Sequence, residues 1–316
     1  MKTLAIGIDI GGTRTKIGLV DLASGVVDAM LVTPTETKNG EQFLQRIGTA
    51  ISQLKDKAIA ELTQLAGVGI GVPGFVFANG VVDSTYGFLE FMEDYPLASY
   101  IQERHGLPCL LDNDARVVAL GEATFGQGER FSRVLVLTLG TGLGLGLTVD
   151  GRLDGPLPYA HMGGHLTITT NDTVCYCGKT GCLESLVSSA GLLRIANRLG
   201  WSPEQAGLPP TAETIFNQKK AGNPLAGAIV DEYIGYLQTG IDNYVNLYAP
   251  DIIVLGGGMA KGLTGETDRL HNARLLSPYK AYKTRVTISD LEEKAGIVGS
   301  ALLFKPERLA PLPNES

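Results

Sequence analysis

Apolar residues near the start of the chain occur in two kinds of pattern. TLAIGIDI (3–10) and TKIGLVDL (15–22) are near-continuous apolar runs of strand length separated by a Gly-Gly-Thr turn, which predicts a β-hairpin. Over residues 40–65 the apolar side chains instead recur at helical spacing, and AGVGIGVPG then returns to a strand pattern. Alternating strands and helices predict an α/β fold with both faces of the sheet covered. The apolar residues of the helical pattern are Phe43, Ile47, Ile51, Leu54, Ala58 and Leu62.

The rest of the chain continues this alternation and repeats its opening pattern. Residues 133–153 again consist of a strand-like run, a Gly-Thr-Gly turn and a second strand-like run. We interpret this as an internal structural repeat with one hairpin per domain. The other predicted elements are a helix in ASYIQERHGLP, a strand in CLLDND, helices over 114–126, 183–199 and 224–248, a strand entering a glycine turn over 251–260, and a last helix over 296–305 before a polar tail.

The length of the chain favours two domains. With 316 residues, of which 44% are hydrophobic, it exceeds what one compact domain usually holds. We predict an N-terminal α/β domain over residues 1–113, to which the helix near 296–305 returns. A larger C-terminal α/β domain is predicted over 114–295.

Charge and hydropathy exclude several classes of protein. The net charge is −7, and no cluster of lysine or arginine supplies the positive patch that nucleic-acid binding requires. No stretch reaches the roughly 18 uncharged apolar residues of a membrane helix, and no signal-peptide cleavage site follows the first apolar run. We therefore expect a cytoplasmic protein whose cysteines persist as thiols.

Two glycine-rich hairpin turns, at residues 11–13 and 140–142, suit a phosphate chain. Glycine lets phosphates approach backbone amides because it lacks a side chain and tolerates positive φ. The Gly-Lys-Ser/Thr of a P-loop is absent, and GTGLGLG leads into a strand rather than a helix, which excludes a dinucleotide fingerprint. A plain structural turn explains either motif alone. Together with Asp9, which could hold Mg²⁺ through water, the two turns favour a nucleotide site.

Three of the four cysteines and one of the four histidines gather in HLTITTNDTVCYCGKTGC (165–182). Three thiolates and an imidazole form a closed tetrahedral set, which is typical of structural Zn²⁺. A coincidental group of buried thiols is the alternative, and His161 competes with His165 as the fourth ligand. The remaining cysteine, Cys109, follows a core pattern.

The triplet Asp112-Asn113-Asp114 stands where a strand ends and a helix begins, a position that exposes side chains at the edge of an α/β sheet. Phosphoryl transfer to an alcohol needs a carboxylate that accepts the hydroxyl proton. The ordinary pKa of an aspartate would keep Asp114 ionised at pH 7 for this task. The alternative is that Asp112 or Asp114 merely caps the helix.

Four segments, in this order and spacing, resemble the ROK family of bacterial sugar kinases and repressors. They are DIGGTRTK (9–16), LDNDARVVALGE (111–122), LGTGLGLG (139–146) and CYCGKTGCLE (175–184). The resemblance covers nearly the whole chain. It implies a two-domain actin-like ATPase (ribonuclease H-like) fold with ATP in the cleft between the domains, and ATP- and Mg²⁺-dependent phosphorylation of a hexose.

The resemblance also implies roles for individual residues. Asp114 would be the general base, Asn113 and Glu184 would bind sugar hydroxyls, and His165 would both hold zinc and reach the sugar. The implied zinc ligands are His165, Cys175, Cys177 and Cys182. One side of the ATP phosphates would be lined by Asp9, Gly11, Gly12, Thr13 and Lys16, the other by Gly140, Thr141 and Gly142, and the adenosine end by Gly256, Gly257 and Gly258.

Two departures from the family pattern leave the sugar open. Met162 stands where sugar-phosphorylating members have a sugar-binding glutamate, and a thioether cannot replace a carboxylate. The loop before YPL offers Phe88 and Met92, where glucokinase-like members carry Asn and Trp, and His161 and Glu90 could replace the lost contacts. We expect a glucokinase-like enzyme, with a kinase for fructose, allose or an N-acetylated amino sugar such as N-acetylmannosamine as the alternative.

Two non-enzymatic alternatives remain. A non-catalytic sugar sensor would fit Met162, whereas a repressor is disfavoured because Met1 and Lys2 alone precede the first strand. Family members often form homo-oligomers, and a dimer is expected.

Overall fold

The computed structural model describes residues 2–77, 79–84, 89–155, 158–159, 161–170, 173–202, 209–271 and 282–305. The chain forms two compact units. Unit 1 comprises residues 1–132, 146–161 and 291–316, and unit 2 comprises residues 133–145 and 162–290. The domain division expected from the sequence, with its boundary after residue 113, stays a prediction.

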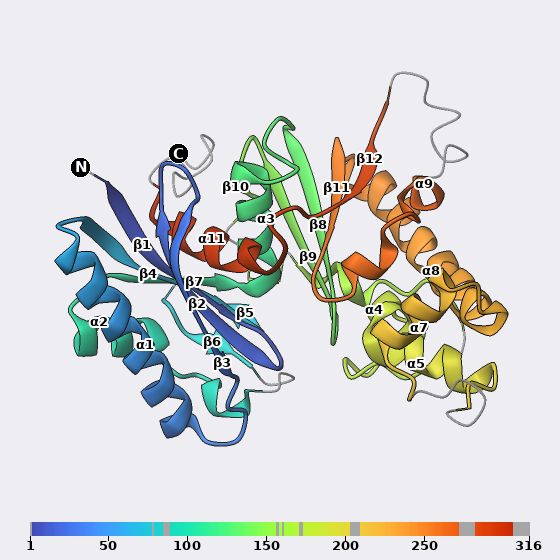
Figure 1. Cartoon of the computed structure of the whole chain (residues 1–316), viewed down its shortest axis with the longest axis horizontal. Coiled ribbons are helices and arrows are strands. Elements are labelled where there is room, and N and C mark those ends of the chain that lie inside the picture. The colour runs from blue at the N-terminus through green and yellow to red at the C-terminus, as the bar shows by residue number, and fades with distance from the viewer. Residues whose placement is uncertain are drawn as a thin grey trace. The chain divides into compact units, whose positions relative to one another are not determined.

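The first sheet has five strands in the order β3-β2-β1-β4-β7 (Figure 1). The first three strands pair antiparallel, and β4 and β7 run parallel to β1. The apolar pattern predicted these strands except β3, an edge strand with mostly half-exposed side chains. The bounds are β1 (Thr3–Ile10), β2 (Arg14–Asp21), β3 (Val27–Pro34), β4 (Gln64–Val72) and β7 (Cys109–Asn113).

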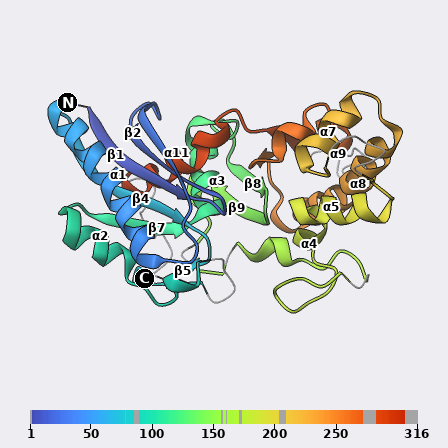
Figure 2. The same ribbon diagram turned by 60° about the horizontal axis from the view of Figure 1, so that its bottom comes forward.

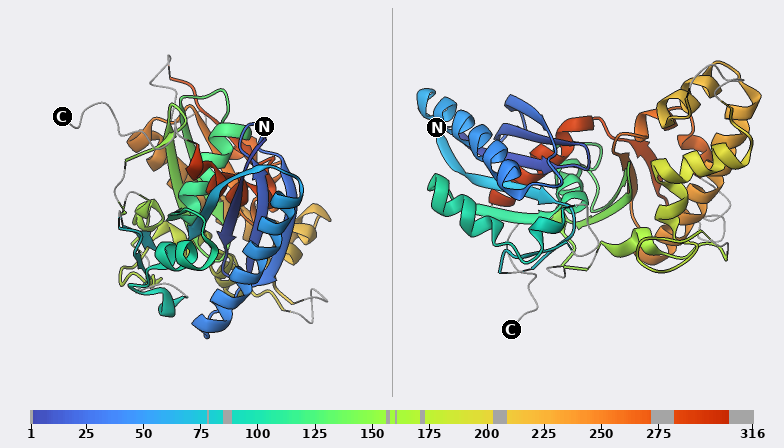
Figure 3. Two further views of the ribbon diagram at one scale, coloured as in Figure 1. Left: turned by 90° about the vertical axis from the view of Figure 1, so that its left-hand side faces the viewer. Right: turned by 90° about the horizontal axis from the view of Figure 1, so that it is seen from below.

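Helices cover both faces of this sheet. Figure 3 shows α1 (Gly40–Ala60) and α2 (Leu97–His105) together on one face and α11 (Ala295–Ala301) on the other. The second face also carries α3 (Asp114–Phe125), and η5 (Leu302–Phe304) continues α11. A separate hydrophobic core fills each side of the sheet.

Glycines in the sheet let α11 approach the strands closely. A Cβ on Gly7 would lie 1.9 Å from the carbonyl oxygen of Ile297, and one on Gly69 would lie 1.8 Å from that of Ser300. Real Cβ atoms do not come this close, so α11 seats on β1 and β4 only because both strand positions lack a side chain.

The helix predicted over residues 40–65 is shorter than its apolar pattern. α1 ends at Ala60, Leu62 has a φ of 53°, and Leu65 already belongs to β4. Leu62 is 82% exposed, so its helical spacing from Ala58 is accidental. A left-handed backbone at Leu62 cannot continue a right-handed helix.

The second sheet has the order β10-β9-β8-β11-β12, so both sheets place their strands in the chain order third, second, first, fourth, fifth. This shared order supports the internal repeat that the sequence suggested. β11 pairs parallel with β8 and β12. The bounds are β8 (Arg133–Leu139), β9 (Leu143–Val149), β10 (Arg152–Leu153), β11 (Ile252–Gly256) and β12 (Arg285–Ile288).

Unit 2 also contains a group of helices that packs around α8 (Pro224–Tyr248; Figure 2). The bounds of α8 match the prediction. The single helix predicted over 183–199 is wrong, because the chain breaks at Ser188. The Ser188 hydroxyl accepts a hydrogen bond from Gly191 N and begins a new helix. The other members are α4 (Leu183–Val187), α5 (Ser189–Arg198), α7 (Ala212–Lys220) and α9 (Thr267–Leu270).

None of the described helices combines the length and apolar character that crossing a bilayer requires. The predicted C-terminal tail, residues 306–316, lies outside the described residues.

Candidate functional site

Asp9 and Lys16 face each other across the first hairpin of unit 1. The two residues are paired in the register of β1 and β2, and Lys16 Nζ lies 3.5 Å from Asp9 Oδ2. The Asp9 side chain is 15% exposed. Burial raises the pKa of Asp9, and the ammonium of Lys16 opposes that rise. The hairpin thus holds a carboxylate and an ammonium beside the exposed Gly12 and Thr13.

Asn113 and Asp114 occupy the junction between β7 and α3. Asn113 Oδ1 accepts hydrogen bonds from the amides of Ala115 (3.0 Å) and Arg116 (3.3 Å), so Asn113 is the N-cap of α3. Its Nδ2 donates to the carbonyl oxygen of Gly74 at 3.0 Å. The sequence placed the alternative capping role on Asp112 or Asp114, and this is wrong. These contacts use both oxygen lone pairs and one N–H, and the remaining N–H faces Asp114, whose ionised form it favours.

Arg116 is a residue that the sequence analysis missed. This buried guanidinium binds Asp112 at 2.7 Å and donates to the carbonyl oxygens of Asp154 (3.2 Å) and Gly155 (2.9 Å). It therefore ties the start of α3 to the loop that leads to His161. The i, i+4 spacing of Asp112 and Arg116 was the only available signal, and it does not predict the bonds to the loop.

The ionisation of Asp114 differs from the expectation. Burial raises the pKa of Asp114 to about 7, and the neighbouring Asp9 carboxylate adds to the rise. An ordinary aspartate pKa is therefore the wrong premise. A base whose pKa lies near the working pH is better matched to proton abstraction than an ordinary carboxylate is.

In unit 2, the turn at residues 140–142 rests on Glu184. The buried Glu184 carboxylate accepts a hydrogen bond from Leu143 N at 3.2 Å, and a Cβ on Gly142 would lie 3.1 Å from Glu184 Oε2. The carbonyl oxygen of Gly140 accepts from Ser189 N at 2.8 Å. Residues around α4 thus fix the turn that the sequence assigns to phosphates.

The glycine turn after β11 needs one left-handed residue. Of the glycines expected to meet ATP, all within the described ranges, only Gly257 has a positive φ, at 83°. A Cβ there would lie 2.4 Å from the carbonyl oxygen of Leu139. At Gly140, in contrast, an added Cβ would meet nothing within 4 Å, so the packing around this position does not require glycine.

The four residues expected to bind zinc come together. One ligand atom from each of His165, Cys175, Cys177 and Cys182 lies within 4.8 Å of the other three. Cys175 Sγ is 3.6 Å from His165 Nδ1, and Cys177 Sγ is 3.6 Å from Cys182 Sγ. His161 belongs to unit 1, where its ring packs against Phe75 in a tilted arrangement with centroids 5.2 Å apart.

The chemistry of this set fits a divalent cation. Burial raises the pKa of Cys175, and burial together with the neighbouring sulfur atoms raises that of Cys182 to about 12. Three thiolates this close repel one another unless a cation neutralises them. Soft sulfur and imidazole donors in a closed fourfold set suit Zn²⁺.

Tyr176, between two of these cysteines, has no role in the sequence analysis. Its hydroxyl lies 3.2 Å from His165 Nε2, and it is close enough to the Glu184 carboxylate to favour the ionised form of that group. The residue thus contacts both side chains of unit 2 that were expected to bind sugar. Spacing along the chain gave no signal for this contact.

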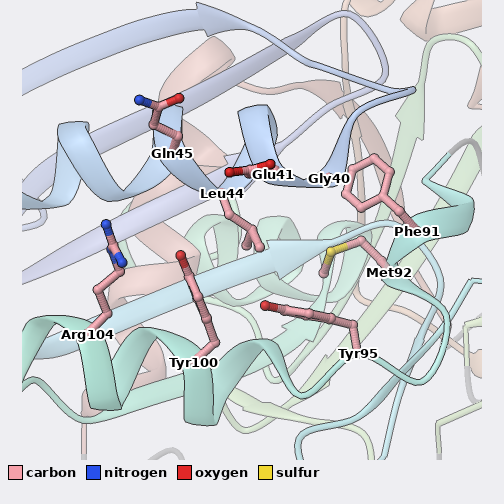
Figure 4. Close-up of a pocket in the computed structure, with 9 residues that line it drawn as sticks. All are labelled: Gly40, Glu41, Leu44, Gln45, Phe91, Met92, Tyr95, Tyr100 and Arg104. Atoms are coloured by element: carbon pink, nitrogen blue, oxygen red, sulfur yellow. The ribbon is translucent and has the colours of Figure 1, made fainter.

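The residues that depart from the family pattern are partly placed. Met162, in η2 (Met162–His165), is 43% exposed, and Phe88 lies outside the described residues. Met92 packs into the core of unit 1 and lines a pocket of about 520 Å³ between α1, α2 and η1 (Glu90–Met92) (Figure 4). The other lining residues are Gly40, Glu41, Leu44, Gln45, Phe91, Tyr95, Tyr100 and Arg104, none of which was expected to bind ATP or sugar.

Known proteins resemble this chain over nearly all of its length. A glucokinase of Halalkalibacterium halodurans is 32% identical over 96% of this chain and 95% of its own. A xylose repressor of Caldicellulosiruptor bescii is 28% identical over 96% of this chain and 79% of its own. A ROK family glucokinase of Streptomyces griseus, solved with glucose and AMPPNP, has a TM-score of 0.79 and 27% identity, covering 95% of this chain and 98% of that one.

These findings confirm the predicted fold class, the actin-like ATPase fold of ROK kinases. The sequence pattern of the ROK family matches residues 5–307. The chain therefore belongs to the ROK family.

Proposed function

We propose that this protein is an ATP-dependent hexose kinase of the glucokinase type, in which Asp114 accepts the proton of the sugar hydroxyl. One observation carries the proposal: Asp114 stands at the start of α3 with a pKa of about 7, in the family that contains these kinases. A carboxylate at this position, half ionised near neutral pH, suits a general base.

The reaction moves one proton and one phosphoryl group. As the sugar oxygen forms its bond to the γ-phosphorus of ATP, the bond to the β,γ-bridging oxygen breaks and ADP leaves. The Asp114 carboxylate takes the hydroxyl proton. Mg²⁺, when bound with ATP near Asp9, would spread the charge of the transferring group.

The other residues of the chain would bind and orient the reactants. The remaining N–H of Asn113 can donate to a sugar hydroxyl, and the Glu184 carboxylate and His165 Nε2 can bind others. Backbone amides in the turns at residues 11–13 and 140–142 would hold the phosphates, and the turn at 256–258 the nucleoside.

Glucose is the proposed hexose because the glucokinases named above cover nearly the whole chain. Met162 argues for a changed contact at one sugar hydroxyl, since it lacks the acceptor that a glutamate supplies. Fructose, allose and N-acetylmannosamine are therefore the alternative substrates.

The zinc set would hold η2 and the loop of residues 175–182 in one conformation.

We also propose a homodimer and a cytoplasmic location. The location is supported by the dependence on ATP and by the lack of a disulfide at Cys109, Cys175, Cys177 and Cys182.

Measuring ADP release with MgATP across a panel of hexoses tests the proposal. Glucose should give the highest kcat/KM, and Asp114→Ala should lower kcat at least about 100-fold. Asp56→Ala, an exposed aspartate on α1, is the matched control. No turnover with any sugar, or full turnover by Asp114→Ala, would contradict the proposal. Unchanged sugar affinity without turnover would instead identify a sensor, and saturable DNA binding at physiological salt would identify a repressor.

A further inference from the structure

The Tyr176 hydroxyl lies against His165 and Glu184, the two side chains of unit 2 that are proposed to bind the sugar. It lies 3.2 Å from His165 Nε2 and beside the Glu184 carboxylate, whose ionised form it favours. The two rings meet edge to face, with centroids 5.2 Å apart and an interplanar angle of 81°. His165, Tyr176 and Glu184 all belong to unit 2.

The direction of these hydrogen bonds follows from the other side of the imidazole. His165 Nδ1 faces Cys175 Sγ at 3.6 Å. With zinc on Nδ1, the ring hydrogen is on Nε2. With zinc bound, His165 Nε2–H would donate to the Tyr176 oxygen, which leaves the Tyr176 O–H for the Glu184 carboxylate.

A sugar hydroxyl that accepts from His165 and donates to Glu184 has the same donor and acceptor pattern. His165 Nε2 has a single hydrogen, so Tyr176 and the sugar compete for it. The Tyr176 side chain is free to move outward at low cost, because the residue is 59% exposed. The backbone on either side is held, because Cys175 and Cys177 belong to the zinc set.

We propose that Tyr176 is a specificity-determining latch, whose hydroxyl substitutes for a sugar hydroxyl between His165 and Glu184 and is displaced when the sugar binds. This inference rests on the proposed function, since it takes both residues as sugar ligands. The latch selects sugars with a hydroxyl that both accepts and donates at that point. It also weakens the binding of every sugar, because the apparent dissociation constant equals the intrinsic one divided by the fraction of molecules in which the latch is open.

Tyr176→Phe removes the competing hydroxyl and keeps the ring. Calorimetry of the zinc-loaded variant with glucose and no ATP should show a dissociation constant about 3- to 10-fold lower than that of the wild type. This is the gain expected when the sugar no longer has to break one competing hydrogen bond. The KM for glucose should fall by a similar factor while kcat changes less than about twofold. Zinc content should be unchanged.

Tyr236→Phe is the matched control, because the Tyr236 hydroxyl also donates to a carboxylate, that of Glu232, on the surface of α8. Its sugar affinity should equal that of the wild type. Equal or weaker glucose binding by Tyr176→Phe, in a wild type that turns glucose over, overturns the latch and leaves the kinase intact. A wild type that neither binds nor phosphorylates any hexose overturns both.

A second measurement does not depend on the variant. Crystal structures of the zinc-loaded wild type with and without glucose should show the Tyr176 hydroxyl leaving His165 Nε2 when the sugar is present. A hydroxyl that keeps this contact in the sugar complex also overturns the latch.

Discussion

Gly296, at the start of α11, lies against the carboxyl group of Asp9. A Cβ on Gly296 would be 2.5 Å from Asp9 Cγ and 2.7 Å from Asp9 Oδ2. Both residues belong to unit 1, and α11 reaches β1 from the far end of the chain. The position of the carboxylate therefore depends on a missing side chain in the last helix.

Gly296→Ala should displace the Asp9 carboxylate and lower kcat about 10-fold or more, because the carboxylate can no longer hold its place beside Lys16. Steady-state kinetics with varied MgATP measures the effect. Gly227→Ala is the control, since a Cβ at this position of α8 meets nothing within 4 Å. That substitution should leave kinetics unchanged and stabilise the protein slightly. Wild-type kinetics in Gly296→Ala would show that the Asp9 position does not matter.

The pH profile should report the ionisation of Asp114. A base must be deprotonated to accept a proton, so kcat/KM for the sugar should fall as the pH falls through the Asp114 pKa of about 7. The slope below that pH should approach one decade per pH unit. Initial rates between pH 5.5 and 9 measure this profile. A profile flat down to pH 5.5 would mean that Asp114 is not the base or that its pKa is ordinary.

Asp114→Asn should stabilise the fold while abolishing turnover. The pKa of Asp114 is about 7 in the folded protein and about 3.9 in an unfolded chain. Between these two pH values Asp114 keeps its proton in the folded protein but not in the unfolded chain. The free energy of unfolding of the wild type, relative to that of the asparagine variant, therefore declines as the pH rises from about 4 to 7 and is constant above. The variant should be more stable by about 4 kcal/mol at pH 8 and about equal near pH 4. Denaturant unfolding at both pH values measures the difference, and a gain of equal size at pH 4 would assign it to another cause.

Removing zinc should loosen unit 2. Elemental analysis of the purified protein should give one zinc per chain. Cys182→Ser should lose the zinc and lower Tm by about 5 °C or more, because the remaining buried thiols lose the metal ion that they share. Cys109→Ala removes a buried thiol outside the set and should keep the zinc. Full zinc content in Cys182→Ser would remove Cys182 from the ligand set.

Arg116→Met should weaken both stability and turnover. It leaves the Asp112 carboxylate without its partner and frees the carbonyl oxygens of Asp154 and Gly155. Loss of one partner of a buried ion pair costs about 3 kcal/mol. Thermal unfolding together with the KM for the sugar measures the change, since the freed loop leads to His161. Arg46→Met, an exposed arginine of α1 paired with Glu36, is the control and should change stability by less than about 0.5 kcal/mol.

Apolar spacing alone predicted most of the secondary structure. β1, β7 and α8 begin and end within a residue or two of their patterns, because each buries a continuous apolar face. The pattern failed where the spacing of apolar residues did not match their burial or the course of the backbone. Leu62 has helical spacing but lies outside α1, and the 183–199 pattern hides the break at Ser188.

Local composition also identified much of the candidate site. Three cysteines within residues 175–182 and a nearby histidine predicted a metal set because few other structures concentrate thiols in this way. The strand-to-helix junction at Asn113 and Asp114 was likewise readable, since both residues are neighbours in the chain.

What the sequence determined by itself is therefore whatever neighbours along the chain decide: the strands, the long helices, the histidine and cysteine set, and the family. The tertiary structure alone decided the pKa of Asp114, the contact of Gly296 with Asp9 and the place of Tyr176 between His165 and Glu184. The physical reason is that burial, close approach and charge act through space. They depend on groups that only folding brings together.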